Sequence, residues 1–378
     1  MDKETAINQT DPRAGYLAHK EEIDVAIARV LASGRYILGA EVEAFDAEFA
    51  EFLDARYSIG VASGTDALEL ALRACGIRPG DVVLTVSHTA VATVAAIERC
   101  GGFPVFVDVD PRTFTLDPEA LEMTLETDLP GLAKAVVPVH LYGHPADMPA
   151  IRDIARRYDL FVIEDCAQAH GAAIDNQKVG TWGDIAAFSF YPTKNLGAVG
   201  DGGSIVTNNE HLARSAHQLR QYGWKTRYVS DSIGYNSRLD EIQAAILRVK
   251  LKYLASATQQ RQQIAATYKA LLSDVDICLP SSHNDVTHVY HQFVIQHQDR
   301  DLLRSYLGQH NIATLIHYPL PVHLQPAFSH LAKDLPKTER LAKTILSLPM
   351  HPGLSESNLE HITSTMINWL NEEKTILA

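Results

Sequence analysis

Short apolar runs alternate with amphipathic helical patterns through the first half of the chain. The apolar runs predict strands at residues 57–62, 81–86, 103–109, 133–141, 160–165, 186–191 and 203–208. Helical patterns separate most of them, as at residues 65–76, 89–102 and 148–159. Such alternation predicts a parallel sheet with helices on both faces, and the nearly continuous apolar character of the strands predicts burial on both sides.

The rhythm changes in the second half of the chain. Residues 238–272 have no glycine or proline and predict one long helix that leads out of the first domain. The patterns at residues 288–296, 301–310 and 358–370 are typical of a smaller α+β unit. We therefore predict a large α/β domain over residues 1–250 and a small C-terminal domain over residues 251–378.

Composition narrows the classes of function. The chain has 378 residues, of which 46% are hydrophobic, and a formal net charge of −13 without a basic run. A nucleic-acid surface needs a concentrated basic footprint, so none is expected, whereas a small anionic ligand needs only a local pocket. The N-terminus has no apolar core of signal-peptide type, and no apolar stretch is long enough to cross a bilayer. The protein is therefore expected in the cytoplasm, without a membrane partner.

The four cysteines are dispersed along the sequence, at Cys75, Cys100, Cys166 and Cys278. No pair has the close spacing of a zinc site. We interpret them as free thiols in a reducing compartment, and we expect no metal.

Ligands of parallel sheets bind beyond the carboxyl ends of the strands, so the residues at those ends are the candidates for a site. After residues 57–62, Gly64 and Thr65 open a helix, whose unpaired N–H groups suit a phosphate. An ordinary N-cap made by Ser63 or Thr65 is the alternative. Asp165 ends another very apolar strand, where a carboxylate is costly unless a cation or N–H group meets it. Gln168 follows three residues later; a structural aspartate that caps the next helix is the alternative here.

The stretch SFYPTKNLGAVGDGG at residues 189–203 places Lys194 between an aromatic strand and a run of glycines. A lysine amine in a confined site forms an imine with an aldehyde cofactor, and a carboxylate beside a pyridine nitrogen keeps that nitrogen protonated. Lys194, Asp165, the helix start at Gly64 and Thr65, and the hydroxyl of Ser189 together indicate pyridoxal 5′-phosphate (PLP). The alternative for Lys194 alone is an ordinary surface charge.

Five motifs in order give the chain a resemblance to a known family. They are GVASGTDALELAL, VIEDCAQAHGA, FSFYPTKNLGAVGDGG, GYNSRLDEIQAA and LIHYPLPVHLQPAF. The sequence resembles the DegT/DnrJ/EryC1/StrS family of PLP-dependent nucleotide-sugar aminotransferases over nearly its whole length. The resemblance implies the aspartate aminotransferase fold, PLP fold type I, and a homodimer with a shared active site.

The resemblance also implies roles for single residues. Lys194 forms the imine with PLP, Asp165 pairs with the pyridine nitrogen, and Gln168 bonds the ring hydroxyl. The phosphate is held by Gly64, Thr65 and Ser189, and Asn236 reaches the phosphate of the partner subunit's cofactor.

One position departs from the family pattern. Many members stack an aromatic residue on the pyridine where this chain has Ala90, and His88 is the nearest flat side chain. Stacking by His88 and a histidine that merely starts a helix are both open.

The resemblance implies transamination, because dehydratases of the family carry histidine in place of the lysine at 194. L-glutamate is the expected amino donor. The segment IHYPLPVHLQPAF is similar to that of enzymes acting on a dTDP-3-keto-6-deoxyhexose, with His317, Tyr318 and His323 as candidates to line the sugar pocket. Scaffold packing is the alternative for these three.

Four cations could offset the diphosphate charge or be simply solvated: Arg220, Lys225, Arg227 and Arg238. Amination at carbon 4 of a UDP-, GDP- or dTDP-sugar, a PLP-dependent dehydratase, and a PLP-binding regulator remain the other interpretations.

Overall fold

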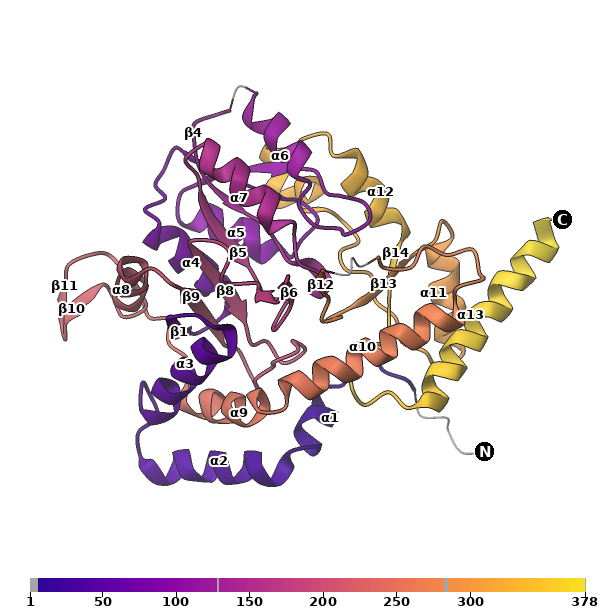
Figure 1. Cartoon of the computed structure of the whole chain (residues 1–378), viewed down its shortest axis with the longest axis horizontal. Helices are drawn as coiled ribbons and strands as arrows, with labels where there is room; N and C mark the ends of the chain where they lie inside the picture. Colours follow the sequence, from indigo (N-terminus) through magenta and orange to yellow (C-terminus); the bar gives the residue numbers. More distant parts are fainter. Residues whose placement is uncertain (1–5, 128, 282–284, 378) are drawn as a thin grey trace.

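A seven-stranded sheet forms the centre of the protein in a computed structural model that describes residues 6–127, 129–281 and 285–377 (Figure 1). The strand order is β1-β9-β8-β5-β4-β2-β3. The strands are β1 Tyr57–Val61, β2 Asp81–Val86, β3 Phe103–Val107, β4 Leu132–Val137, β5 Phe161–Asp165, β8 Ile185–Ser189 and β9 Gly203–Thr207. Every strand predicted in this part of the sequence is therefore present.

The sheet is mostly rather than wholly parallel. Strands β3, β2, β4, β5 and β8 pair in parallel, whereas β9 is antiparallel to both β8 and β1. The chain passes from β8 to β9 through the loop of residues 190–202 without a crossover helix, and a direct return of this kind produces antiparallel pairing. The expectation of a parallel sheet is thus corrected at one strand.

Helices cover both faces of the sheet, as the apolar strands predict. One face carries α4 Gly64–Ala74, α5 Val91–Arg99 and α8 Glu210–Leu219, and the other carries α3 Ala40–Leu53, α6 Pro118–Leu125, α7 Met148–Arg157 and α9 Glu241–Leu251. Strand β4 shows the alternation, because Ala135 and Val137 belong to the first core and Val136 to the second. Successive side chains of a strand point to opposite faces, so both cores are filled from the same strands.

The long helix predicted at residues 238–272 is wrong as a single element. The structure has α9 and a separate α10 Leu254–Leu271, with a break at Lys252 and Tyr253. The ring of Tyr253 stacks on His19 with centroids 3.8 Å apart, and its hydroxyl hydrogen-bonds Glu22. These contacts with the N-terminal helices α1 Pro12–Leu17 and α2 Lys20–Ser33 lie at the break, where tertiary packing overrides local propensity.

The C-terminal part has its own apolar cluster. Strands β13 Phe293–Gln296 and β14 Ile345–Leu348 pair antiparallel and pack with α10, α11 Arg300–Gln309 and α13 Glu356–Leu377. Helix α12 Pro336–Thr344 instead contributes Leu341 to a core of the sheet. A separate cluster supports a domain boundary near residue 250, which stays an interpretation.

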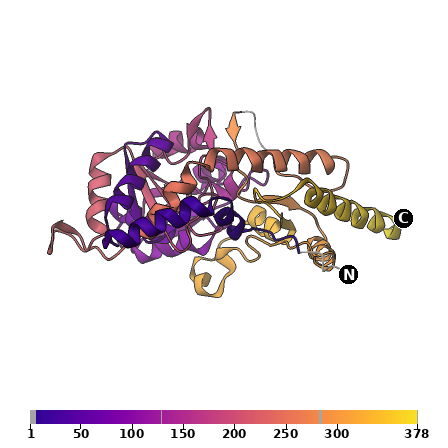
Figure 2. The same cartoon turned by 90° about the horizontal axis from the view of Figure 1, so that it is seen from below.

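Short elements complete the described chain. Strands β6 Ala173–Ile174, β7 Gln177–Lys178 and β12 Val286–Thr287 form a small sheet, and single 3-10 turns occur at Leu141–Gly143, Val322–Leu324 and Pro326–Leu331. The hairpin of β10 Trp224–Thr226 and β11 Val229–Ser230 projects from the body at the end opposite the C-terminus (Figures 1 and 2). Among the described residues, no helix has the length and apolar character needed to span a membrane. All four cysteines are free, as predicted.

Candidate active site

Three strand ends that the sequence marked as candidates lie together at one edge of the sheet. Asp165 at the end of β5 pairs with Ala187 of β8, and Ser189 at the end of β8 pairs with Gly203 of β9. The start of α4 reaches the same place, because a Cβ atom added to Gly64 would lie 2.6 Å from the Cβ of Ser189. The carboxyl ends of the central strands therefore form the candidate site.

Two glycines allow the helix start to approach the sheet this closely. A Cβ at Gly203 would meet the carbonyl oxygen of Ser63 at 2.4 Å, closer than real Cβ atoms come. The Ser63 side chain accepts a hydrogen bond from the backbone N–H of Asp66 at 3.1 Å, so Ser63 does cap α4. The cap uses only one of the N–H groups of the first turn, so it leaves room for an anion as well. We call Ser63, Gly64, Thr65, Ser189 and Gly203 the glycine end of the site.

Asp165 is a buried carboxylate held by neutral donors. Thr93 of α5 donates its hydroxyl hydrogen to Oδ2 at 2.8 Å, and the backbone N–H of Ala167 donates to Oδ1 at 3.1 Å. Its side chain makes no ion pair with any residue in the described ranges. Burial raises the pKa of Asp165, while the Thr93 and Ala167 bonds and the nearby charge of Lys194 lower it. A cationic N–H group placed against this carboxylate would satisfy it.

Gln168 lies beside Asp165 and links two segments. Its Oε1 accepts from the backbone N–H of Tyr142 at 2.8 Å, and its Nε2 donates to the hydroxyl of Tyr318 at 3.0 Å. Its amide is thereby oriented, as the predicted contact with a ring hydroxyl requires. Thr93, Asp165 and Gln168 form what we call the carboxylate end of the site.

Lys194 lies in the loop between β8 and β9, half-buried and without a carboxylate at ion-pair distance in the described part of the chain. Burial lowers the pKa of its amine to about 8, and the charge of Asp165 partly opposes this. The loop is tight, because Lys194 N donates to Tyr191 O at 2.8 Å and a Cβ at Gly197 would lie 2.4 Å from Pro192 O. The lysine is therefore a confined, readily deprotonated amine rather than an ordinary surface charge.

His88 is completely buried, and burial lowers its pKa to about 4. Its Nε2 lies 2.9 Å from the Tyr142 hydroxyl, which itself donates to the carbonyl oxygen of His317. Since that hydroxyl has one hydrogen, Nε2 of His88 must be the donor in their bond. The imidazole is thus fixed in position; its stacking on a cofactor stays a prediction. Ala90, where the resemblance leads us to expect an aromatic residue, is the N-cap residue of α5.

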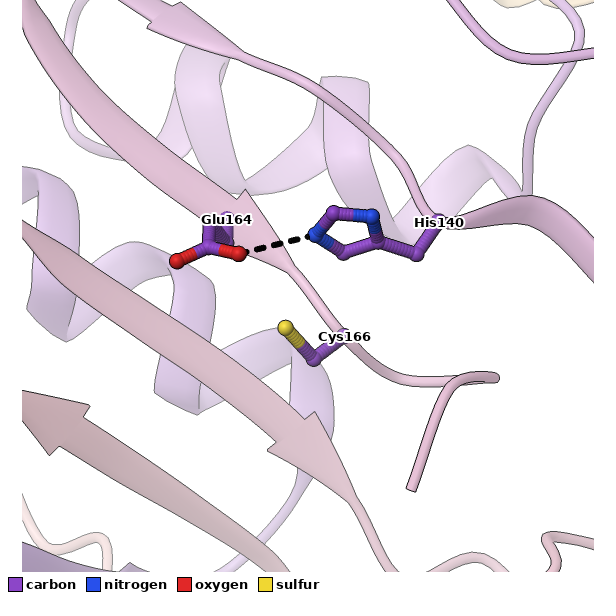
Figure 3. A group of neighbouring side chains, drawn as sticks. All are labelled: His140, Glu164 and Cys166. Atoms are coloured by element: carbon purple, nitrogen blue, oxygen red, sulfur yellow. Dashed lines mark hydrogen bonds and ion pairs between the residues drawn. The ribbon is translucent and has the colours of Figure 1, made fainter. Parts of the chain in front are cut away.

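His140, Glu164 and Cys166 form a buried group of side chains, and the last two flank Asp165 in the sequence (Figure 3). His140 Nε2 lies 3.0 Å from Glu164 Oε2, and the backbone N–H of Ala146 donates to His140 Nδ1 at 3.0 Å. Backbone N–H groups of Gly180, Trp182 and Gly183 donate to the same carboxylate at 2.7–2.8 Å.

Cys166 lies within 4.8 Å of both His140 and Glu164, close enough for the three to suggest a metal site. Nδ1 accepts from an N–H group, so Nε2 carries the hydrogen and His140 has no lone pair left for a metal. Burial also raises the pKa of the Cys166 thiol. The group is therefore a hydrogen-bonded support.

The segment after β4 connects His140 to Asp165 through backbone hydrogen bonds. Asp165 N donates to Pro138 O at 2.9 Å, and His140 N donates to Asp165 O at 3.0 Å. Two residues farther along, Tyr142 orients Gln168 through its backbone and His88 through its hydroxyl. The turn at residues 138–142 thus fixes one face of the site.

The three predicted sugar-pocket residues fall in different surroundings. Tyr318 and His317 are half-buried beside Gln168 and Tyr142, and His317 Nδ1 lies 2.9 Å from the Ser347 hydroxyl. His323 is buried, with Nδ1 2.7 Å from the Ser87 hydroxyl and its ring against Phe106. These contacts favour scaffold packing for His323, whereas His317 and Tyr318 border the carboxylate end.

Within the described chain, the residues predicted to meet a partner or a diphosphate make no hydrogen bond or ion pair with Lys194, Asp165 or Gln168, although Ser237, between Asn236 and Arg238, hydrogen-bonds Ala62 and Asp66 beside the glycine end. Asn236 is exposed and forms an isolated bridge with Gln221 beside the β10–β11 hairpin. Arg220 is buried, donates to Gly60 O at 2.7 Å and pairs with Asp46 at 3.6 Å, so it is a scaffold residue. The other three cations are Lys225, which pairs with Asp231 at 3.3 Å, Arg227, which lies over the ring of Tyr228, and the half-buried Arg238.

Sequence reasoning missed Thr93 and Tyr142. Thr93 occupies the buried side of an amphipathic helix, where a threonine is easily taken for a small core residue. Tyr142 has a φ of 59°, and this left-handed backbone turns its N–H towards Gln168. The one usable signal is the position of Tyr142 just beyond a predicted strand, where side chains of a site are expected.

The residues present fit PLP. The buried Asp165 carboxylate lacks a cation that a pyridinium N–H would supply, and Lys194 is an amine of lowered pKa without a carboxylate partner among the described residues. The glycine end is a cradle that a side chain at Gly64 would fill. A helix start of this kind accepts a phosphate.

Comparisons with known proteins agree with this chemistry. The model of the DegT/DnrJ/EryC1/StrS aminotransferase family matches residues 18–367. A dTDP-3-amino-3,4,6-trideoxy-alpha-D-glucose transaminase of Streptomyces venezuelae is 45% identical over 95% of each chain. A UDP-N-acetyl-3-dehydro-alpha-D-glucosamine 3-aminotransferase of Acidithiobacillus ferrooxidans is 44% identical over 97% of this chain and 98% of that one.

Solved structures have the same fold. The crystal structure of S. venezuelae DesV superposes with a TM-score of 0.94 at 44% identity and covers 97% of this chain and 99% of that one. A Bacillus subtilis structure, NtdA with bound cofactor PMP, superposes with a TM-score of 0.88 at 33% identity, over 94% and 82% of the two chains.

Proposed function

Since the chain belongs to the DegT/DnrJ/EryC1/StrS aminotransferase family, we propose that it aminates carbon 3 of a dTDP-linked 3-keto-6-deoxyhexose. The protein is a PLP-dependent aminotransferase of nucleotide-linked sugars, with the aspartate aminotransferase fold. The position of the amination, the nucleotide and the roles of single residues belong to the proposal. The observation that carries these roles is the meeting of Lys194, Asp165 and the glycine end at one edge of the sheet.

PLP, when bound, supplies an aldehyde for an amine and a ring that accepts electrons from the carbon next to nitrogen. Asp165 would bind the ring nitrogen and hold a proton on it, since a pyridinium lets the buried carboxylate stay ionised. Gly64, Thr65 and Ser189 would hold the phosphate, and Gln168 the ring hydroxyl. The amine of Lys194 would carry the covalent link and, once released, move a proton as a general base and acid. A pKa of about 8 leaves about a tenth of this amine neutral at pH 7.

The names of the relatives support amination at carbon 3. Both transaminases described above are named for that position, one with a dTDP-sugar and one with a UDP-sugar. His317 and Tyr318 border the carboxylate end from the loop before α12, where they would face the sugar. A dTDP-sugar remains our choice, with a UDP-sugar as the alternative that the second relative favours.

L-glutamate as amino donor, a homodimer and a cytoplasmic location complete the proposal. The β10–β11 hairpin supports the homodimer, because it projects from the body and apolar side chains in and just after it are exposed; Tyr228 in its turn is 73% exposed, and Ile233, three residues after β11, is 93% exposed. A second copy that covers this hairpin would bury such side chains and bring Asn236 to its neighbour's glycine end. Absence of a helix that could cross a membrane among the described residues agrees with the location.

One incubation tests the proposal. The enzyme with PLP and L-glutamate is given dTDP- and UDP-linked 3-keto and 4-keto sugars separately, and the products are followed by mass spectrometry and NMR. The expected result is one 3-amino sugar per 2-oxoglutarate formed, with the dTDP-linked 3-keto substrate fastest. Amination at carbon 4, or loss of water without 2-oxoglutarate, would overturn it.

A further inference from the structure

A cavity of about 370 Å³ lies beside Lys194, on the side of the N-terminal helices. Its walls come from the segment at residues 10–19, the loop at residues 192–197, the end of α9, the first turns of α10 and the turn at residues 351–353. The volume is in the range of small-molecule sites. The groups already assigned to the cofactor, apart from Lys194 itself, do not line it.

The cavity wall carries an excess of positive charge. Lys194, Lys250 and Arg261 line it, and Asp11 is its single acidic residue. Asp11 is already engaged, since it accepts from Ala14 N at 3.0 Å as the cap of α1. With Lys194 set aside for the cofactor, the remaining side chains leave a net charge of +1.

Arg261 is the unusual member of the wall, because it is only 7% exposed. One of its nitrogens, Nη1, donates to the carbonyl oxygens of Tyr290 at 3.2 Å and Met350 at 2.9 Å. Burial lowers its pKa to about 10. No carboxylate comes within 4 Å of Arg261 or Lys250 across residues 6–127, 129–281 and 285–377. A buried guanidinium without an anion is costly, and carboxylates are the anions that its planar fork binds best.

Lys250 lines the cavity from α9 and contacts the loop at residues 192–197. Its Nζ donates to the carbonyl oxygen of Gly197 at 2.7 Å, which leaves two of its three N–H groups for another acceptor. Gly197 is three residues from Lys194, so an anion on Lys250 lies close to the loop that presents the reactive amine. The cavity therefore presents two cations, Lys250 and Arg261, near Lys194, which the amine of a donor must approach.

We propose that this cavity binds the carboxylates of the amino donor, with Arg261 and Lys250 as the recognising groups. The inference rests on the proposed function, and it names an α-amino dicarboxylic acid as donor class. Such a donor carries a net charge of −1, which balances the wall. Binding its carboxylates here would bring its amine towards Lys194, and a monocarboxylic donor would leave one cation unmatched.

The experiment measures binding separately from turnover. Glutarate has two carboxylates but neither an amine nor a ketone, so it reports the cavity by calorimetry on the PLP-loaded enzyme at fixed ionic strength. Lys250→Met and Arg261→Lys are expected to weaken glutarate binding about tenfold or more and to raise KM for glutamate similarly, with a much smaller change for alanine. Lys252→Met is the matched control, because Lys252 is exposed, pairs with Glu22 and lies outside the cavity.

The outcomes separate the two proposals. If both variants bind glutarate as the wild type does, the donor subsite is overturned and the aminotransferase assignment stands. If the variants lose affinity for dTDP instead of glutarate, the cavity binds the nucleotide diphosphate, and the proposal that it binds the amino donor is overturned. If no donor is consumed by the wild type, the proposed function fails, and glutarate affinity still tests the cavity. Thermal melts show whether Arg261→Lys keeps the fold; Lys250→Met carries the test if it does not.

Discussion

The carboxylate end and the glycine end of the site are built by different means. At the carboxylate end, side chains fix other side chains: Thr93 holds Asp165, Tyr142 holds Gln168, and the His140–Glu164 pair holds the turn behind them. At the glycine end, close backbone contacts fix the geometry, because Gly64 lies against Ser189 and Gly203 lies against Ser63. The carboxylate end therefore depends on hydrogen bonds that single substitutions can remove. The glycine end depends on the absence of a side chain, because one added carbon atom would fill the space between the segments.

The comparison teaches where each end is vulnerable. Removing a hydroxyl from a hydrogen-bonded carboxylate leaves the geometry largely intact and costs on the order of 1–3 kcal/mol. Adding a methyl group to a close backbone contact displaces the contact itself, at a cost of about 1–3 kcal/mol or more. Loss of a hydrogen bond should therefore alter reactivity first, whereas added volume should alter cofactor affinity first.

The largest effect is expected from Lys194→Ala, which removes the group between the two ends. Turnover should fall below detection, since no other amine takes its place, and the absorbance of the covalently bound cofactor should vanish. Both ends remain, so equilibrium dialysis should still detect bound PLP. Turnover at the parent rate would refute the role of Lys194, and complete loss of PLP binding would show that the two ends do not suffice to hold it.

A smaller but still large effect is expected from Gly64→Ala. The new Cβ would lie 2.6 Å from the Cβ of Ser189, so the helix start or the strand end must move. We expect PLP affinity to fall about 10- to 100-fold, measured by fluorescence titration, while turnover at saturating PLP changes less. Gly308→Ala is the control, because a Cβ there meets nothing within 4 Å. Equal PLP affinity in Gly64→Ala and Gly308→Ala would contradict the proposal that close backbone contacts at the glycine end hold the phosphate.

Thr93→Val tests the carboxylate end with a nearly isosteric change. Loss of the 2.8 Å bond leaves Asp165 with one donor, which raises the pKa of Asp165 and weakens its hold on a ring proton. We expect kcat to fall on the order of tenfold and PLP affinity to change little. Thr89→Val is the graded control, since Thr89 lies 3.1 Å from Thr93 and acts on Asp165 only through it. A fall in affinity with unchanged kcat would reverse the contrast between the two ends.

Prediction from the sequence succeeded where one strong constraint decides an element. Continuous apolar runs such as residues 81–86 favour a buried strand, and the strand is present. Asp165 and Lys194 stand out in the sequence because their charges end or follow such runs, while their roles in the reaction stay predictions. The antiparallel β9 and the break at Tyr253 were missed, because both depend on contacts with segments far away in the sequence. Local pattern carries no information about such partners.

The same distinction applies within the site. The glycine end could be predicted, since a glycine after a strand and before a helix is a local signal. Thr93 and Tyr142 could not, because each acquires its role from a partner 72 or 26 residues away, through bonds that only the folded chain creates. The donor cavity is the extreme case, as Arg261 and Lys250 are ordinary helix residues in the sequence.

The smallest effect is expected in the pH dependence of PLP binding by the apoprotein. The midpoint of that pH dependence reports how the carboxylate end and the glycine end each influence the amine of Lys194. Its amine reacts only when neutral, and its pKa is about 8, so the rate constant should rise with pH to a midpoint near pH 8. The Asp165 carboxylate raises that pKa, since a nearby negative charge favours the protonated amine. Asp165→Asn should therefore move the midpoint to lower pH, by up to about one unit.

Stopped-flow absorbance between pH 6 and pH 10 would measure this shift. Ser189→Ala, at the glycine end, removes no charge and should slow capture without moving the midpoint. A midpoint that stays unchanged in Asp165→Asn would mean that Asp165 is not ionised beside Lys194 in the apoprotein. Burial already raises the pKa of this carboxyl, so the presence or absence of the downward shift decides whether the carboxylate end acts on the lysine by charge or by shape alone.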